Sequence, residues 1–185
     1  GRQSNHVRMT AAAANKVGLA CTIVLSSDPV DAPTGNLVLD LLLGADIVWA
    51  GRLDYAATEA AIEDTCARLT AEGRRPYLMP IGGASPVGAL GYVTGAEELL
   101  QQAPDLGVVV LADGSGGTHA GLAVGLGDHG KVLGVDVGAR SDLDEQVPAK
   151  AVEVAALAGR PAPVGSCQVD HGQVGGGYAV TTDAG

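Results

Sequence analysis

The stretch Val108-Val-Val-Leu-Ala-Asp-Gly-Ser-Gly-Gly-Thr-His-Ala-Gly121 decides the fold class. Its first residues form a continuous apolar run, which is typical of a parallel strand that is covered on both faces. Glycine, serine and threonine then follow at residues 114–118, and small residues suited to a helix come next. A buried strand that leads through a glycine-rich turn into a helix predicts a parallel α/β protein.

The same alternation runs along the chain. Strands are predicted at residues 20–25, 46–49, 76–79, 107–111 and 131–135. Helices are predicted at residues 4–17, 35–43, 55–72, 85–102, 118–126 and 142–157. Ser4 is the expected N-cap of the first helix, and Asp54 and Gly73 are the expected start and stop of the third. This alternation predicts βαβ units and parallel sheets, with a hinge between two lobes at residues 80–86. The Gly- and Pro-rich tail at residues 161–165 and 175–178 is expected to be irregular.

Composition excludes several classes of function. The net charge of −10 and the scattered basic residues argue against a nucleic-acid partner and an anionic membrane surface. The most apolar stretch, residues 37–50, contains two aspartates and is too short to span a bilayer. The three cysteines, Cys21, Cys66 and Cys167, lie in no metal-ligand spacing, so no metal site is predicted, and a reducing cytoplasm is the expected location.

The glycine-rich turn has the chemistry of a phosphate-binding site. Glycines let the backbone approach a ligand closely, successive N–H groups can point into one hollow, and a helix N-terminus favours negative charge. The turn lacks the Lys-Ser/Thr pair of a nucleotide P-loop, and His119 stands where a dinucleotide-binding turn needs glycine. An ordinary tight turn between strand and helix is the alternative.

A second polar helix start lies at Gln3-Ser-Asn-His-Val-Arg8. The free N–H groups of such a terminus can bind a carboxylate, although a simply capped helix is the alternative. His6 is either a base or a structural residue. His119 and His129 are too far apart to share one helix face, and no Ser/His/Asp or Cys/His set is evident.

Five segments in order resemble the D-cysteine desulfhydrase/1-aminocyclopropane-1-carboxylate deaminase family of pyridoxal-phosphate enzymes. The first is Gln3-Ser-Asn-His-Val-Arg8, which resembles the family's QSNHVR segment. The others are Gly35-Asn-Leu-Val-Leu-Asp40, Pro76-Tyr-Leu-Met-Pro-Ile-Gly-Gly83, Gly88-Ala-Leu-Gly-Tyr-Val93 and Gly114-Ser-Gly-Gly-Thr-His-Ala-Gly-Leu122. The similarity covers residues 2 to about 140 and returns at Gly177-Tyr178.

The resemblance implies a fold and a site. The fold would be the two-lobed, three-layer αβα fold type II (tryptophan-synthase-β-like), truncated at both ends. Residues 1–80 would form the smaller lobe, on the side of the substrate carboxylate and the cofactor ring, and 81–185 part of the larger lobe. The phosphate of pyridoxal 5'-phosphate would bind at Gly114, Ser115, Gly116, Gly117 and Thr118. Asn5 would bind the ring hydroxyl; Ser4, Asn5 and His6 would bind the substrate carboxylate; and Tyr178 would be a catalytic residue near the substrate amine and carboxylate.

The implied activity is a lyase reaction on a small amino acid by a protein that is a homodimer when full length. D-cysteine would give pyruvate, ammonia and sulfide. The alternatives are 1-aminocyclopropane-1-carboxylate deamination and L-cysteate sulfo-lyase activity, although His6 and His119, where deaminases carry glutamine, favour the desulfhydrase. A non-catalytic small-molecule-binding α/β domain and a structural subunit that pairs with a catalytic homologue are alternatives of other classes.

The family's Schiff-base lysine lies in a Gly-Asn-Lys segment upstream of QSNH, and that segment is not in this sequence. The lysines present are Lys16, Lys131 and Lys150. Lys16 follows an asparagine but lies at the end of the first predicted helix, where a cation simply suits the helix dipole. We therefore expect an incomplete enzyme that is inactive by itself for lack of this lysine.

Overall fold

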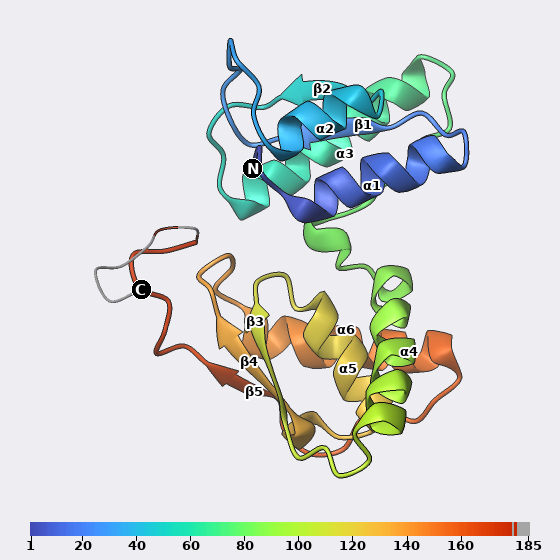
Figure 1. Cartoon of the computed structure of the whole chain (residues 1–185), viewed down its shortest axis with the longest axis vertical. Coiled ribbons are helices and arrows are strands. Elements are labelled where there is room, and N and C mark those ends of the chain that lie inside the picture. Colours follow the sequence, from blue (N-terminus) through green and yellow to red (C-terminus); the bar gives the residue numbers. More distant parts are fainter. Residues whose placement is uncertain (179, 181–185) are drawn as a thin grey trace. The chain divides into compact units, whose positions relative to one another are not determined.

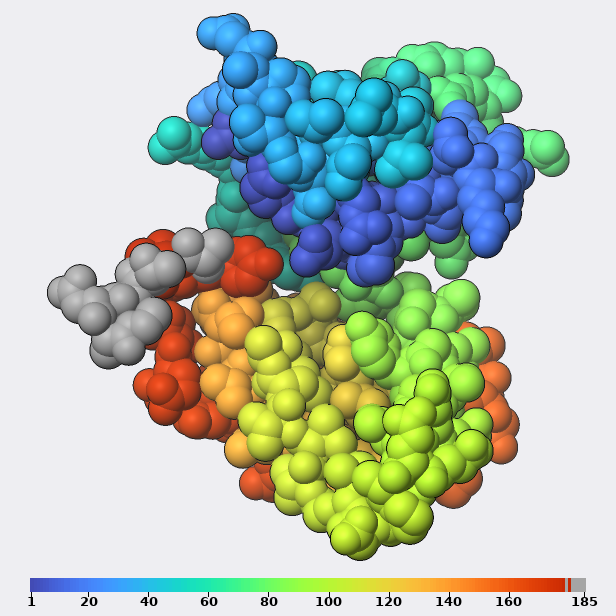
Figure 2. All heavy atoms as spheres, in the orientation of Figure 1, coloured from blue at the N-terminus to red at the C-terminus, as the bar shows by residue number. Residues whose placement is uncertain are grey.

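The computed structural model describes residues 1–178 and 180, and the chain divides into two compact units, Gly1–Ile81 and Gly82–Gly185 (Figure 1 and Figure 2). Each unit contains a parallel β-sheet with helices packed on it, as the alternating sequence pattern predicts. No helix of the described residues is both long and apolar enough to cross a membrane.

The first unit is built on two parallel strands, β1 (Thr22–Leu25) and β2 (Asp46–Trp49). Its helices are α1 (Asn5–Lys16), α2 (Asn36–Leu42) and α3 (Tyr55–Ala71). Helices α1 and α2 pack on each other, and α3 packs against β1. The core of this unit consists of Ala11, Ile23, Leu25, Leu37 and Ala45. Burial of these apolar side chains, rather than intrinsic propensity, stabilises such short elements.

The second unit contains a three-stranded parallel sheet in the order β3 (Val109–Asp113), β4 (Val132–Asp136), β5 (Gln168–Asp170). Its helices α4 (Pro86–Gln102), α5 (Gly117–Leu126) and α6 (Leu143–Ala158) pack together around an apolar cluster (Figure 1). Two 3₁₀ turns, η1 (Ile81–Gly83) and η2 (His129–Lys131), complete the described elements. In the sheet Asp113 lies beside Asp136, so the ends of β3 and β4 share one edge.

Three helix starts follow the capping chemistry of their sequences. Ser4 Oγ accepts a hydrogen bond from Val7 N at 3.3 Å, which confirms Ser4 as the N-cap of α1. Asp54 Oδ1 accepts from Ala57 N at 2.8 Å at the start of α3. Ser85 caps α4 in the same way, with Pro86 in the first helical turn, where a missing N–H costs nothing.

Helices α4 and α5 approach each other closely because two glycines of α5 carry no side chain. A Cβ atom at Gly121 would lie 2.4 Å from the carbonyl oxygen of Ala89. A Cβ at Gly125 would lie 2.4 Å from the Cβ of Ala96. Contacts this short are not compatible with the present helix separation, so both positions require glycine for space.

The segment after β5 is held by His171, which bridges two carboxylates. Its Nδ1 lies 2.8 Å from Asp136 Oδ2, and its Nε2 lies 2.8 Å from Asp144 Oδ2. The hydrogen bonds to Asp136 and Asp144 raise the pKa of His171 above its usual value, because both favour the charged imidazolium. The bridge therefore connects this segment to β4 and α6.

One predicted strand is wrong, and one observed strand was not predicted. Residues 76–79 form no strand, and Tyr77 is 71% exposed. Pro76, the first residue of this segment, and Pro80, which follows it, cannot donate to a β-ladder, so the segment offers few donors for strand pairing. Strand β5, which pairs with β4, was not predicted because its three residues are too few to give a periodic signal.

Candidate functional site

The predicted phosphate-binding turn lies between β3 and α5. Gly116 is the N-cap of α5 and adopts a left-handed conformation with φ 79°, which glycine enters without steric cost. Its carbonyl oxygen accepts the first helical hydrogen bond, from Ala120 N at 3.0 Å. No side chain caps this helix, so the N–H groups of its first turn are left for another partner.

The backbone of the turn is open to an anion. In the described part of the chain, the N–H groups of residues 115–118 donate to no carbonyl outside the helix. The positive end of the α5 dipole lies at the same place, so a dianion there gains both hydrogen bonds and a favourable field. The Ser115 and Thr118 hydroxyls are further donors on the same turn. These groups fit a phosphate ester.

The wall beside the turn is made by residues 82–84. A Cβ atom at Gly117 would lie 3.0 Å from Ala84 Cα, and one at Gly82 would lie 2.6 Å from Ser115 Oγ. The Lys150 ammonium, on α6, donates to the carbonyl oxygen of Ala84 at 2.5 Å. Sequence reasoning assigned Lys150 no role, because 66 positions separate it from Ala84 and no local pattern links them.

The second predicted anion site lies at the N-terminus of α1, where a polar network holds it against the start of α2. Gln3 Oε1 accepts from Asn36 N at 2.9 Å, and Gln3 Nε2 donates to the carbonyl oxygen of Thr34 at 2.9 Å. Asn36 Nδ2 donates both to Gln3 O and to Asn5 Oδ1, at 2.9 Å each. A Cβ at Gly35 would lie 2.3 Å from Gln3 Oε1, so glycine is required there.

This network orients Asn5. Because its Oδ1 accepts from Asn36, its Nδ2 hydrogens are left to donate to a ligand, and the side chain is exposed. Ser4 is half-buried, with its Oγ in the helix cap. Burial lowers the pKa of His6, which favours the neutral imidazole at neutral pH. The sequence motif predicted Ser4, Asn5 and His6 together, but it gave no signal for the orienting roles of Gln3 and Asn36.

The remaining predicted residue, Tyr178, lies in the segment that follows β5. Its side chain is 64% exposed, and its backbone N lies near Gly138, just after β4. The carboxyl ends of β3 and β4 share one edge, so Gly138 and the glycine-rich turn both follow that edge. The second unit thus contains the turn and Tyr178, and the first unit contains Ser4, Asn5 and His6.

A buried hydrogen bond between a histidine and an aspartate lies next to the turn. His119 Nδ1 is 2.7 Å from Asp113 Oδ2, and both side chains are almost completely excluded from solvent. Gly134 on β4 leaves room for the pair, because a Cβ there would lie 2.5 Å from Asp113 Oδ2 and 2.8 Å from His119 Nδ1. The pair anchors the first turn of α5 to the end of β3.

Comparisons with known proteins identify the family of this chain. The family model described as pyridoxal-phosphate dependent enzyme matches residues 1–184. D-cysteine desulfhydrase of Salmonella typhi is 39% identical over 198 residues, which cover 99% of this chain and 58% of that protein. The D-cysteine desulfhydrase of Salmonella paratyphi B gives the same identity and coverage. The chain therefore spans 58% of the length of these curated relatives.

Solved structures give the same result for the fold. The crystal structure of an ACC deaminase homologue matches with a TM-score of 0.79 and 32% identity, covering 94% of this chain and 56% of that one. A pyridoxal 5'-phosphate-dependent aspartate racemase matches with a TM-score of 0.54 and 24% identity over 80% of this chain and 42% of that one, which supports the fold alone. The family model matches nearly the whole sequence, and the relatives agree with it. The chain therefore belongs to the pyridoxal-phosphate-dependent enzyme family.

Proposed function

We propose that this chain forms part of a pyridoxal-phosphate-dependent lyase that acts on a small amino acid, with D-cysteine as its substrate. The observation that carries the proposal is the uncapped N-terminus of α5, whose glycine-rich turn leaves several N–H groups for a phosphate. The 39% identity to D-cysteine desulfhydrases supports the choice of substrate.

In this proposal the turn holds the cofactor by its phosphate. The N–H groups of residues 115–118 and the hydroxyls of Ser115 and Thr118 donate to the phosphate oxygens, and Lys150 adds positive charge beside the wall at Ala84. The bound cofactor supplies an electron sink for a carbanion at the substrate α-carbon. The protein's part is to fix that group in place and to orient the substrate.

The N-terminus of α1 binds the other polar groups. Asn5 Nδ2 donates to the ring hydroxyl of the cofactor, in the orientation that Asn36 imposes. The substrate carboxylate binds at the start of α1 to Ser4, Asn5 and His6, where the helix dipole favours an anion. A neutral His6 can donate one hydrogen bond to this carboxylate without an additional charge.

Tyr178 acts near the substrate amine and carboxylate. Its phenol can donate to a carboxylate or exchange a proton with an amine. The overall reaction converts D-cysteine and water to pyruvate, ammonia and hydrogen sulfide: the Cα–H and Cβ–S bonds break, and hydrolysis of the resulting enamine releases ammonia. We also propose that the chain alone binds the cofactor without turnover. The resemblance places the family's lysine upstream of Gln3, whereas Lys16, Lys131 and Lys150 all follow Gln3.

The experiment has two parts. First, the chain is titrated with pyridoxal 5'-phosphate and with pyridoxal, and we expect the phosphorylated form to bind more tightly. Second, sulfide and pyruvate release are measured for the chain alone and for a longer protein in which a Gly-Asn-Lys segment is included upstream of Gln3. The substrates are D-cysteine, L-cysteine, L-cysteate and 1-aminocyclopropane-1-carboxylate. Turnover of D-cysteine by the longer protein alone supports the proposal, whereas equal binding of both vitamers contradicts the phosphate site.

Lysine variants test the assignment of the covalent cofactor bond. Lys16 lies in the last turn of α1, far along the helix from Asn5, so Lys16→Ala should leave cofactor absorbance and activity nearly unchanged in the longer protein. Asn5→Ala should weaken both. Loss of the cofactor's protein-bound absorbance in Lys16→Ala would overturn this assignment.

The second candidate function is deamination of 1-aminocyclopropane-1-carboxylate, which the 32% identical ACC deaminase homologue structure favours. This reaction opens a ring instead of expelling sulfide, so it yields 2-oxobutanoate and ammonia. Preferential turnover of the cyclopropane substrate over D-cysteine in the same assay would select it. We also propose a homodimer for the longer protein, which light scattering measures directly.

A further inference from the structure

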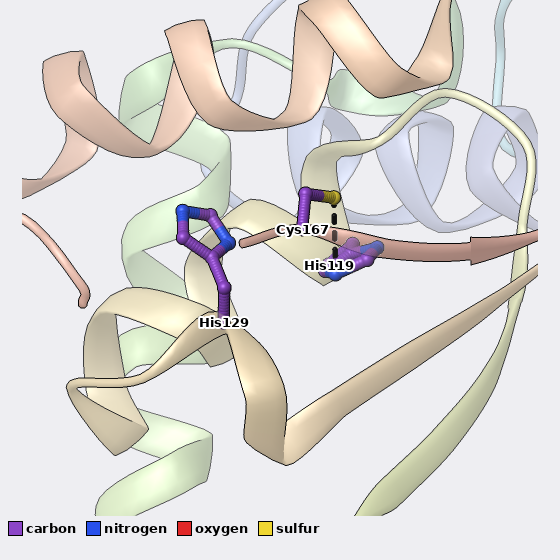
Figure 3. A group of neighbouring side chains, drawn as sticks. All are labelled: His119, His129 and Cys167. Carbon is purple, nitrogen blue, oxygen red and sulfur yellow. Dashed lines mark hydrogen bonds between the residues drawn. The ribbon is translucent and has the colours of Figure 1, made fainter. Parts of the chain in front are cut away.

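Three side chains that are separated in sequence meet in the second unit. The ligand atoms of His119, His129 and Cys167 all lie within 4.8 Å of one another. They come from α5, from η2 and from the residue just before β5 (Figure 3). Their separation along the chain explains why no metal-ligand spacing is visible in the sequence.

The distance between two of these atoms matches a tetrahedral metal. His119 Nε2 lies 3.7 Å from Cys167 Sγ. Zinc bonds of about 2.3 Å to sulfur and about 2.0–2.1 Å to nitrogen, at a tetrahedral angle, place the two ligand atoms about 3.6 Å apart. The spacing of these two atoms is therefore that of two ligands of one tetrahedral cation.

His119 is held in the tautomer that such a cation requires. Because the Asp113 carboxylate accepts a hydrogen bond from Nδ1, the Nδ1 atom carries the proton and Nε2 presents its lone pair toward Cys167. A carboxylate that orients a histidine from behind in this way is the usual support of a metal-bound imidazole. Both side chains are buried, so water does not compete for this hydrogen bond.

His129 offers a buried ring nitrogen that could bind a metal ion. Its side chain is 94% buried, with 6% of its surface exposed, and its Nδ1 has no hydrogen-bond partner among the described residues. Figure 3 shows this ring with one nitrogen turned toward Cys167 and His119. Buried polar atoms are normally paired, so an unpartnered nitrogen that points into a cluster of ligands indicates a missing partner.

The backbone fixes the distance between His129 and the segment that carries Cys167. His129 N donates to the carbonyl oxygen of Val164 at 2.8 Å, and Val164 N donates to that of Gly127 at 3.1 Å. Cys167 and His129 also line an open pocket of about 420 Å³, together with Asp144, Ser166 and Gly165. A cation in the cluster would thus reach solvent through this pocket.

We propose that His119 Nε2, His129 Nδ1 and Cys167 Sγ form a binding site for one zinc-class cation, with its fourth coordination position open to the pocket beside His129. Two imidazoles and a thiolate are a borderline-soft set that selects zinc or copper over magnesium and calcium. In the metal-free chain, burial raises the pKa of Cys167 to about 11, and the charges of Asp113 and Asp144 add to this effect. The thiol is therefore protonated, and a metal ion that binds Sγ must displace this proton. The proposal gives the cation no part in the cofactor chemistry proposed above.

Cobalt(II) is the probe, because tetrahedral cobalt–thiolate complexes absorb visibly. The full chain is reduced, freed of metal with a chelator, and titrated with CoCl₂ and then with ZnCl₂. We expect one equivalent of cobalt, a sulfur-to-metal charge-transfer band, displacement by zinc, and a higher thermal midpoint with zinc than without it. No stoichiometric binding in the reduced chain would overturn the proposal and leave the contact between His119 and Cys167 as a thiol–imidazole hydrogen bond.

Matched variants separate the site from adventitious binding. Cys167→Ser should abolish the charge-transfer band and weaken cobalt affinity, whereas Cys66→Ser, which alters a thiol on α3 in the other unit, should leave both unchanged. Asp113→Asn should weaken affinity about 10–100-fold, because it disturbs only the orientation of His119. Circular dichroism of the metal-free variants checks that they fold; if Cys167→Ser is unfolded, His129→Gln serves as the second test. A wild-type band in a folded Cys167→Ser or His129→Gln, or its loss in Cys66→Ser, contradicts the proposed ligands.

Discussion

Gly116→Ala is the sharpest test of the phosphate-binding turn, because the left-handed backbone there can be perturbed without any change of charge. Gly116 has φ 79°, and Gly127, at the other end of α5, has φ 73°. An alanine in this region costs about 1–2 kcal/mol relative to glycine, so both Gly116→Ala and Gly127→Ala should lower the free energy of unfolding by that amount. Nothing lies within 4 Å of a Cβ at Gly127, whereas one at Gly116 lies 3.0 Å from Val147 Cγ2, which adds slightly to its cost.

The two variants should differ in cofactor binding. Relief of the strain at Gly116 rotates the peptide that carries the N–H of Gly117, so that this group no longer points toward a phosphate. The loss of one hydrogen bond to a charged group costs about 1.5–3 kcal/mol, which corresponds to a decrease in affinity on the order of ten- to a hundredfold. Gly127 follows the last turn of the same helix, so Gly127→Ala should bind as the wild type does.

Calorimetric titration with pyridoxal 5'-phosphate and with pyridoxal measures this difference, and urea denaturation measures the stability of each variant. We expect Gly116→Ala to lose the preference for the phosphorylated form and Gly127→Ala to keep it, although both are destabilised. An equal effect on the two vitamers, or an equal effect of the two variants, would refute a phosphate site at the α5 N-terminus.

Three further predictions test the packing and polar contacts. Gly121→Ala should lower the free energy of unfolding by about 1–3 kcal/mol, because the new Cβ would collide with the α4 backbone. Gly91 is exposed on α4, and a Cβ there would have nothing within 4 Å, so Gly91→Ala should raise the free energy of unfolding by about 0.5–1 kcal/mol in the same urea denaturation experiment. Asn36→Leu should free the Asn5 amide to rotate and weaken pyridoxal 5'-phosphate binding about tenfold, with helix content unchanged in circular dichroism. Because the pKa of His171 is raised in the folded state, the protonated imidazole stabilises the fold below about pH 6.5, and this contribution is lost as the pH rises through the raised pKa. His171→Gln should remove this pH dependence from the thermal midpoint of unfolding. An unchanged pH profile in the variant would contradict the bridge.

The order of elements could be predicted from the sequence because it depends on local signals. Apolar runs, capping residues and glycine stops specify α1, α3 and α4 to within one or two residues, and the turn at residues 114–118 is where the glycines indicate it. Residues 76–79 show where this reasoning fails. Their apolar character is that of a strand, but a strand also needs a hydrogen-bonding neighbour, and the sequence of one segment does not specify one.

The supporting residues of the sites could not be predicted, because their roles depend on partners far along the chain. Gln3 and Asn36 are ordinary polar residues until α1 and α2 bring them together, 33 positions apart. The distance between His119 and Cys167 is set by a strand pairing that the sequence did not reveal. A spacing rule detects ligands on one helix or one loop, whereas this cluster is assembled from three separate elements.

Glycine illustrates the same distinction within one residue type. At Gly116 the requirement is conformational, so a turn after a buried strand is enough to predict it. At Gly134 the requirement is space: its backbone is an ordinary strand residue, but a side chain there would collide with both Asp113 and His119. A glycine inside a predicted strand therefore indicates that another group approaches closely, and it should prompt a search for that group. Here the group is a buried carboxylate–histidine pair, which is the feature that directs His119 toward the proposed cation site.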